Sequence, residues 1–223
     1  MALPLSALLL ADARTPTGGY AHSGGLEAAI AGGLTAENVP ALVRGRLHTV
    51  GLTEAALAAA AVRAARGGDL DALLGLDGEA AARCPSPALR RAASSLGRSL
   101  LRTAAVLWPQ DPVLPAYRAA STATPRPVAL GVAAGAGGLS PVDAALVALH
   151  EDAATVAAAA VKLLPVDAAA ASGWLAALAP EVERLAAEAA EPCQPGELPS
   201  AAAPLLDLRS LDHERHAARL FAT

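Results

Sequence analysis

Long apolar stretches rich in alanine and leucine alternate along this chain with pairs of glycine or proline, and this pattern predicts a succession of helices. Alanine has the highest helix propensity, glycine commonly ends helices, and proline is accepted in their first turn. Serine, threonine and aspartate ahead of an apolar stretch are typical helix caps. These signals predict helices from Thr53 to Arg66, from Ser86-Pro87 to Leu107, from Asp111-Pro112 to the break at Thr124–Pro127, from Ser140 to Leu164, from Asp167 to Ala179, and from Pro180 to Glu191.

Convincing strand alternation is absent from the pattern. Val128 to Ala134 could be a short strand, but its alanines and the Gly137-Gly138 stop favour a helix. We therefore expect an all-α fold, with residues 1–191 forming a single helical-bundle-like domain of about eight to ten helices joined by short connections.

The last 32 residues have a different pattern. Residues 192–204 hold four prolines and a glycine, which is typical of a linker, and a short amphipathic tail follows up to Phe221. A segment this short is not stable alone. It either folds back on its own domain or docks in a groove of another protein, and the pattern leaves both open.

Composition narrows the function classes. The 223 residues are 54% hydrophobic, so they can bury a substantial core, and their net charge of −4 argues against a nucleic-acid binder. Cys84 and Cys193 lie far apart and form no CxxC motif, which favours two reduced thiols in the cytoplasm. The apolar start, Met1 to Leu10, lacks a preceding basic region and is too short to span a bilayer, so we expect neither a secretory signal nor a membrane segment.

Catalytic motifs are hard to find. No phosphate-binding loop of the GxxxxGK[ST] or GxGxxG type is present, and Gly135–Gly138 is interpreted as a turn between helices. Ser23 next to His22 suggests a nucleophile and a base, but neighbouring side chains rarely face each other and no GxSxG elbow surrounds them. A structural hydrogen bond from Ser23 is the favoured alternative. We expect no cofactor.

Two further polar clusters each allow a structural and a functional interpretation. His213 and His216 are spaced to share a helix face, but no third ligand is evident, so we assign no metal site. Arg91, Arg98 and Arg102 are spaced by seven and four, which also places them on one face. They form either a solvated face or a docking surface for an acidic partner, because arginine is enriched in interfaces.

The most informative segment is the polar, glycine-rich loop from Arg14 to Glu27. We expect it to open a helix near Gly25. It resembles a motif of the UreF family of urease accessory proteins, in which proline, two glycines, an aromatic residue and Ser-x-Gly-Leu-Glu follow one another. The matching residues here are Pro16, Gly18, Gly19, Tyr20, Ser23, Gly25, Leu26 and Glu27. Four further stretches fit the family in the same order, namely 94–101, 127–131, 160–165 and 206–221.

The resemblance implies a helical, cytoplasmic and often dimeric adaptor that carries no chemistry of its own. Such an adaptor bridges UreD (also called UreH) and the GTPase UreG, and the assembly delivers nickel to apo-urease. The residues that we expect to bind partners are Gly18, Gly19, Tyr20, Ser23, Glu27, Arg91, Arg98, Arg102, His213, Arg219, Leu220 and Phe221. The alternative is a small helical enzyme, hydrolase-like, with its site in the loop from Tyr20 to Glu27. The chain departs from the family at Arg126 and at Val166-Asp167, so we assign no partner contacts to these positions.

Overall fold

The all-α class is confirmed by a computed structural model, which describes residues 4–16, 21–201, 203–215 and 220–221, with the side chains of 212–215 left out. Every regular element in these ranges is helical. Eleven α-helical segments run through them: α1 (Leu5–Ala11), α2 (Leu26–Ala31), α3 (Val39–Arg46), α4 (Leu52–Gly67), α5 (Leu70–Ala82), α6 (Pro87–Leu107), α7 (Val113–Ala120), α8 (Arg126–Ala136), α9 (Pro141–Leu163), α10 (Ala168–Ala189) and α11 (Pro204–Arg215). Short 3-10 turns lie at Ala36–Asn38 (η2) and Pro195–Glu197 (η4).

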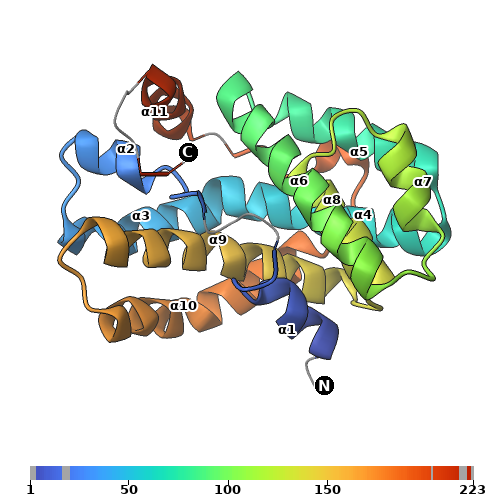
Figure 1. The fold of residues 1–223 in the computed structure, drawn as a ribbon, viewed down its shortest axis with the longest axis horizontal. Helices are drawn as coiled ribbons and strands as arrows, with labels where there is room; N and C mark the ends of the chain where they lie inside the picture. The colour runs from blue at the N-terminus through green and yellow to red at the C-terminus, as the bar shows by residue number, and fades with distance from the viewer. Residues whose placement is uncertain (1–3, 17–20, 202, 216–219, 222–223) are drawn as a thin grey trace.

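The core is built around α4, which packs against both α8 and α9. On its other side α9 packs against α10, and α8 packs against α6, so the helices form a continuous bundle (Figure 1). Small residues bring the central helices close together. A Cβ atom added at Gly131 of α8 would lie only 2.4 Å from the carbonyl oxygen of Ala58 in α4. The alanine-rich composition is therefore used for close helix packing.

Capping residues were predicted well where they act locally. Ser86 accepts the N–H of Leu89 at the start of α6, and Ser140 and Asp143 form a reciprocal capping box at the start of α9. Asp111 accepts the N–H groups of Val113 and Leu114 ahead of α7. The stretch from Val128 to Ala134 lies inside α8, as the alanines suggested.

The predicted cap at Thr53 is wrong, because α3 and α4 run on as one long helix through the π-helical turn η3 (Leu47–Gly51). Thr53 lies inside that helix and donates its hydroxyl hydrogen to the carbonyl oxygen of Thr49, one turn back. The π turn adds a residue to the helix without ending it.

The predicted break at Pro180 is also wrong, since α10 continues through this proline to Ala189. Proline removes one backbone hydrogen bond from a helix interior. Buried Leu178, Val182 and Leu185 lie on both sides of it, and α10 packs along α9. Burial of these side chains explains why the helix is not interrupted.

Length and composition alone would allow α9 to cross a membrane. In the bundle, 56% of its most apolar stretch is buried, where α9 packs against α3, α4 and α10. It also carries two adjacent acidic residues, Glu151 and Asp152, whose side chains are largely buried. These contacts are those of a core helix.

Candidate functional site

The loop ahead of α2 turns sharply at Gly24 and Gly25, both of which have positive φ angles of 60° and 83°. Such angles favour glycine, and both residues also lie against other side chains. A Cβ atom at Gly25 would come within 2.4 Å of Leu206 in α11, and one at Gly24 within 2.8 Å of Val156 in α9. The glycines thus let the C-terminal helix and the core approach the loop.

Ser23 has a structural role in this loop. Its side chain is fully buried, and its Oγ accepts the backbone N–H of Glu27 at a distance of 3.3 Å as α2 begins. The hydrogen-bonding alternative given for Ser23 is therefore confirmed. A buried hydroxyl used in this way is not placed to attack a substrate.

Glu27 joins the two ends of the chain. Its two carboxylate oxygens accept the backbone N–H groups of Leu220 and Phe221, at 2.7 and 3.0 Å. Charge-assisted hydrogen bonds of this kind are among the stronger ones in proteins. The conspicuous glutamate of the N-terminal motif therefore holds the C-terminal tail in place.

The tail folds back onto its own domain, with α11 lying against α2 and α6 (Figure 1). Phe221 is buried, with the Lys162 ammonium 5.3 Å from its ring centre, and the hydroxyls of Ser210 and Ser86 are hydrogen-bonded at 2.7 Å. The outer side of the tail remains apolar. Leu205 and Leu220 are 65% and 67% exposed, and Leu208 is similarly open. The tail therefore packs on its own domain with one side and exposes apolar side chains on the other.

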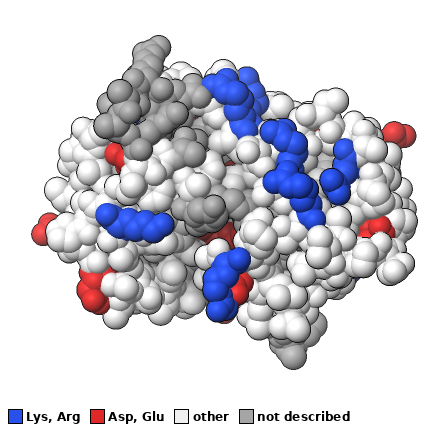
Figure 2. All heavy atoms as spheres, in the orientation of Figure 1, with Lys and Arg blue, Asp and Glu red and all other residues white. Residues whose placement is uncertain are grey.

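The predicted arginine face exists. Arg91, Arg98 and Arg102 are all exposed on α6, and Figure 2 shows basic side chains gathered in a band over this helix. Arg98 and Arg102 form no salt bridge with any residue that the structure describes. Among the residues that the structure describes, most other arginines are paired with carboxylates or with backbone carbonyls, so Arg98 and Arg102 stand out as positive charges with no carboxylate partner.

The arginine face is physically joined to the N-terminal loop. The hydroxyls of Ser99 and Thr103, which lie next to these arginines on α6, both donate to the carbonyl oxygen of Pro16, at 3.2 and 3.1 Å. Because α11 also packs on α6, the start of the loop, the arginine face and the tail are neighbours. We call these three segments together the composite face.

Beneath the composite face lies a cavity of about 430 Å³, a volume typical of small-molecule sites. Gly24 and Gly25 of the loop, Leu96 of α6, and Leu206 and Phe221 of the tail all contribute to its lining. Its floor is charged, because five ionisable side chains from four helical segments meet there. They are Arg46, Glu54, Arg126, Glu151 and Asp152.

Two ion pairs organise this charged floor. The guanidinium of Arg46 is paired with Asp152, and its Nη1 also donates to the carbonyl oxygen of Gly24 at 2.8 Å. Arg126 is paired with Glu151 at 2.7 Å. All four side chains are largely buried, each 12–15% exposed. The arginine that departs from the family pattern at position 126 is therefore an interior residue with a carboxylate partner.

Glu54 is the third carboxylate of the floor, and it forms no hydrogen bond with any residue in the described part of the chain. Burial, and then the negative charge of Asp152, raise the pKa of Glu54, although Arg126 and Arg46 act in the opposite direction. Nearby, burial and the charge of Arg126 lower the pKa of His22. Burial thus disfavours ionisation of both groups.

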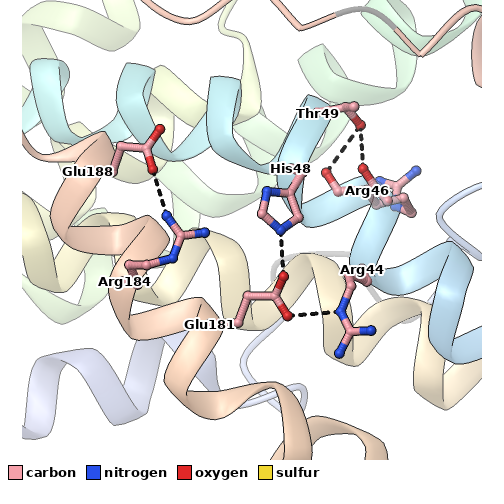
Figure 3. Close-up of polar contacts among 8 residues, drawn as sticks. Arg44, Arg46, His48, Thr49, Glu181, Arg184 and Glu188 are labelled. Atoms are coloured by element: carbon pink, nitrogen blue, oxygen red, sulfur yellow. Dashed lines mark hydrogen bonds and ion pairs between the residues drawn. The ribbon is translucent and has the colours of Figure 1, made fainter.

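A separate polar cluster lies on the surface between η3 and α10 (Figure 3). Glu181 accepts from Arg44 at 3.0 Å and contacts His48 at 2.5 Å, and these contacts lower the pKa of Glu181. Arg184 and Glu188 form an exposed pair one turn further along α10. The contacts of Glu181 join α10 to α3 and η3, whereas the Arg184–Glu188 pair lies within α10, and none of these residues lines the cavity.

Several expected partner-binding residues lie outside the described residues, namely Gly18, Gly19, Tyr20, Arg219 and the side chain of His213. The same holds for His216, so the histidine pair is not placed. Among the residues that the structure does describe, no group of three or more histidine, cysteine or acidic side chains could hold a metal ion.

The charged floor was missed by sequence reasoning. Its members are scattered from position 46 to position 152, and no spacing rule connects them. The available signal was a lone charge inside an alanine-rich helix, such as Glu54, or a charged pair inside an apolar one, such as Glu151-Asp152. Such charges are rarely buried unless they are paired.

Comparison with known proteins agrees with the resemblance noted in the sequence. The family model described as UreF matches residues 34–179. A protein named urease accessory protein UreF from Mycolicibacterium vanbaalenii is 40% identical over 220 residues, covering 97% of each chain. Proteins of the same name from Mycobacterium sp. (strain JLS) and Mycobacterium bovis are 36% and 35% identical, again over 97% of each chain.

Proposed function

The chain belongs to the UreF family of urease accessory proteins, and from this premise we propose that it is a non-catalytic adaptor of urease maturation. In this proposal it assembles in the cytoplasm, as a homodimer, with UreD (UreH) and the GTPase UreG. The assembly delivers nickel, as cargo, to apo-urease. The adaptor itself needs no cofactor.

The observation that carries this proposal is the composite face. Three segments that sequence reasoning marked independently, the loop of 14–27, the arginines of α6 and the C-terminal tail, are neighbours in the folded chain. They combine the exposed positive charges of Arg98 and Arg102, which no described carboxylate pairs, with exposed leucines. Interfaces typically combine an apolar centre with arginine and a polar rim.

Within this face we assign two roles. The outer leucines of α11, with Leu220, would meet UreD, because an exposed amphipathic segment suits a groove in a partner. The arginines of α6 would meet an acidic surface, and UreG is our candidate for it. Gly18, Gly19 and Tyr20, which lie outside the described residues, are part of the proposal through the sequence motif alone.

The alternative of a small hydrolase-like enzyme is less well supported. Its nucleophile would be Ser23, which is buried and already accepts a backbone N–H. His22 is half-buried near Arg126, with a lowered pKa. Among the loop residues that the structure describes, 14–16 and 21–27, no further feature favours bond-breaking chemistry.

The test is reconstitution with purified UreD, UreG and apo-urease. We expect the chain to co-purify with UreD and UreG, to increase urease activation by added nickel, and to show no GTP or ester turnover alone. Substantial turnover by the isolated chain would overturn the adaptor proposal, and so would the absence of any complex with either accessory protein.

A further inference from the structure

Arg83 stands at the end of α5 and binds the proline-rich segment 192–204, which we call the leash. Its Nε donates to the carbonyl oxygen of Pro199 at 3.0 Å, and its Nη2 donates to those of Pro195 and Leu198 at 3.2 and 3.1 Å. On the other side its Nη1 is paired with Glu79. The side chain is only 9% exposed.

The leash has two further attachments at the same place. Leu198 is 5% exposed and belongs to the main core, and the 3-10 turn η4 packs against α5. Gln194 and Glu197 form a reciprocal capping box around that turn. The backbone is thus held from position 195 to position 199, a few residues before α11 begins at Pro204.

We propose that Arg83 is a positioning residue for the C-terminal tail. By holding the leash in one conformation, it keeps α11 folded on α2 and α6 before a partner arrives. This inference rests on the proposed function, in which the tail binds UreD. Arg83 itself touches no partner; it acts through the leash and α11.

The chemistry of arginine explains the choice of residue. Its planar guanidinium carries five N–H donors in a fixed fork, and here it serves three leash carbonyls while keeping an ion pair with Glu79. A lysine ammonium is a compact charge with three donors and cannot reach the same acceptors together. Holding the tail in advance also lowers the ordering cost that binding would otherwise carry.

The experiment compares four full-length proteins: wild type, Arg83→Gln, Arg83→Lys and Glu79→Gln. The last is the matched control, because it removes the ion pair and leaves the leash contacts. Hydrogen exchange is measured for the backbone of 192–215 and for α4, α8 and α9, and the Kd for purified UreD is measured in parallel.

We expect Arg83→Gln to speed exchange in the leash and α11 while the core helices exchange as in wild type. Its Kd for UreD should rise about tenfold, since the tail must be ordered during binding. Arg83→Lys, which keeps the charge beside Glu79, should lie between these limits. Glu79→Gln should resemble wild type.

Unchanged exchange of α11 in Arg83→Gln, or an unchanged Kd, would overturn the inference. So would loss of core protection in both Arg83 variants, because Arg83 would then be a general stability residue. If wild type itself fails to bind UreD, the proposed function fails, while the exchange of α11 still decides whether Arg83 positions the tail.

Discussion

The two halves of α4 are packed in opposite ways. From Ala58 onward, its C-terminal part meets α8 so closely that Gly131 has no room for a side chain against Ala58 and Ala61. Its first half carries Glu54 into a cavity of about 430 Å³, with charged neighbours and with the composite face above it. Packing density close to that of crystals is the norm in protein interiors, so the loosely filled half is the exception that needs an explanation.

The difference separates residues that make the fold from residues that serve another purpose. Alanine and glycine at the contact between α4 and α8 stabilise the bundle through close packing alone. Buried ion pairs, by contrast, are weak evidence for stability, because removing their charges from water costs about as much as the pairing returns. We therefore attribute the stability of the bundle to the contact of α4 with α8, which we call the tight half of α4. We expect function near the part of α4 that carries Glu54, which we call the polar half.

The largest effect is expected from overfilling the tight half. Gly131→Val places a Cβ within 2.4 Å of a backbone oxygen and of the Ala61 Cβ, which are parts of packed helices and cannot swing aside. We expect a loss of about 3 kcal/mol in the free energy of unfolding, measured by chemical denaturation. Gly45→Ala is the control, because a Cβ there meets nothing within 4 Å. It should raise stability by about 0.5 kcal/mol.

Breaking an ion pair in the polar half should lower the free energy of unfolding by a smaller amount. Asp152→Ala leaves the largely buried guanidinium of Arg46 with the Gly24 carbonyl and the nearby charge of Glu54, but with no ion-pair partner in direct contact. We expect a loss of about 2 kcal/mol in the same measurement, because Arg46 loses its charge-assisted hydrogen bonds in a largely buried site. Glu188→Ala removes an exposed partner of Arg184 and should cost only about 0.3 kcal/mol. Equal losses from these two variants would contradict the buried role of the Arg46–Asp152 pair.

Charge reversal on the composite face should change assembly and leave the fold intact. Arg98 is exposed and its Nη1 donates to Ser94, so Arg98→Glu should melt like wild type. Its binding to the acidic partner should weaken by about tenfold at low salt, and the difference should shrink as salt screens the charges. Pull-downs with UreG and UreD at two ionic strengths measure this. The same reversal at Arg184 on α10 is the control, and wild-type assembly by Arg98→Glu at low salt would remove this face from the proposal.

The smallest effect is expected from Glu54, the third carboxylate of the cavity floor. Because the folded-state pKa of Glu54 is raised, the folded chain binds more protons there than the unfolded chain does. This group therefore lowers stability as pH rises from the ordinary carboxylate pKa through the raised one. Glu54→Gln removes that contribution. Its melting temperature should exceed that of wild type more at pH 7 than at pH 4, and a constant difference between the two pH values would contradict the assignment.

Local signals allowed much of the fold to be predicted. Ser86, Asp111 and Ser140 act within three residues of their own positions, so sequence alone sufficed to find the helices that they begin. Pro180 and Thr53 were misjudged, because the continuity of their helices depends on packing against other helices rather than on neighbouring residues. Propensity is a weak guide wherever tertiary contacts override it.

The candidate site was predicted in its parts but not in its arrangement. Motif resemblance and helical spacing marked the loop, the arginines and the tail separately. Their union depends on contacts such as Glu27 with Leu220 and Ser99 with Pro16, which join residues 193 and 83 positions apart. The Arg46–Asp152 pair spans 106 positions in the same way. No periodicity connects residues at such separations.

The most direct test of the composite face is to remove the tail while keeping the part of the leash that Arg83 binds. A chain that ends at Pro199 retains the carbonyls that Arg83 holds and lacks α11, Leu220 and Phe221. We predict that this chain keeps the helical circular dichroism and cooperative melting of the core but no longer co-purifies with UreD. Co-purification at the wild-type level by the folded, truncated chain would contradict the assignment of partner binding to the tail.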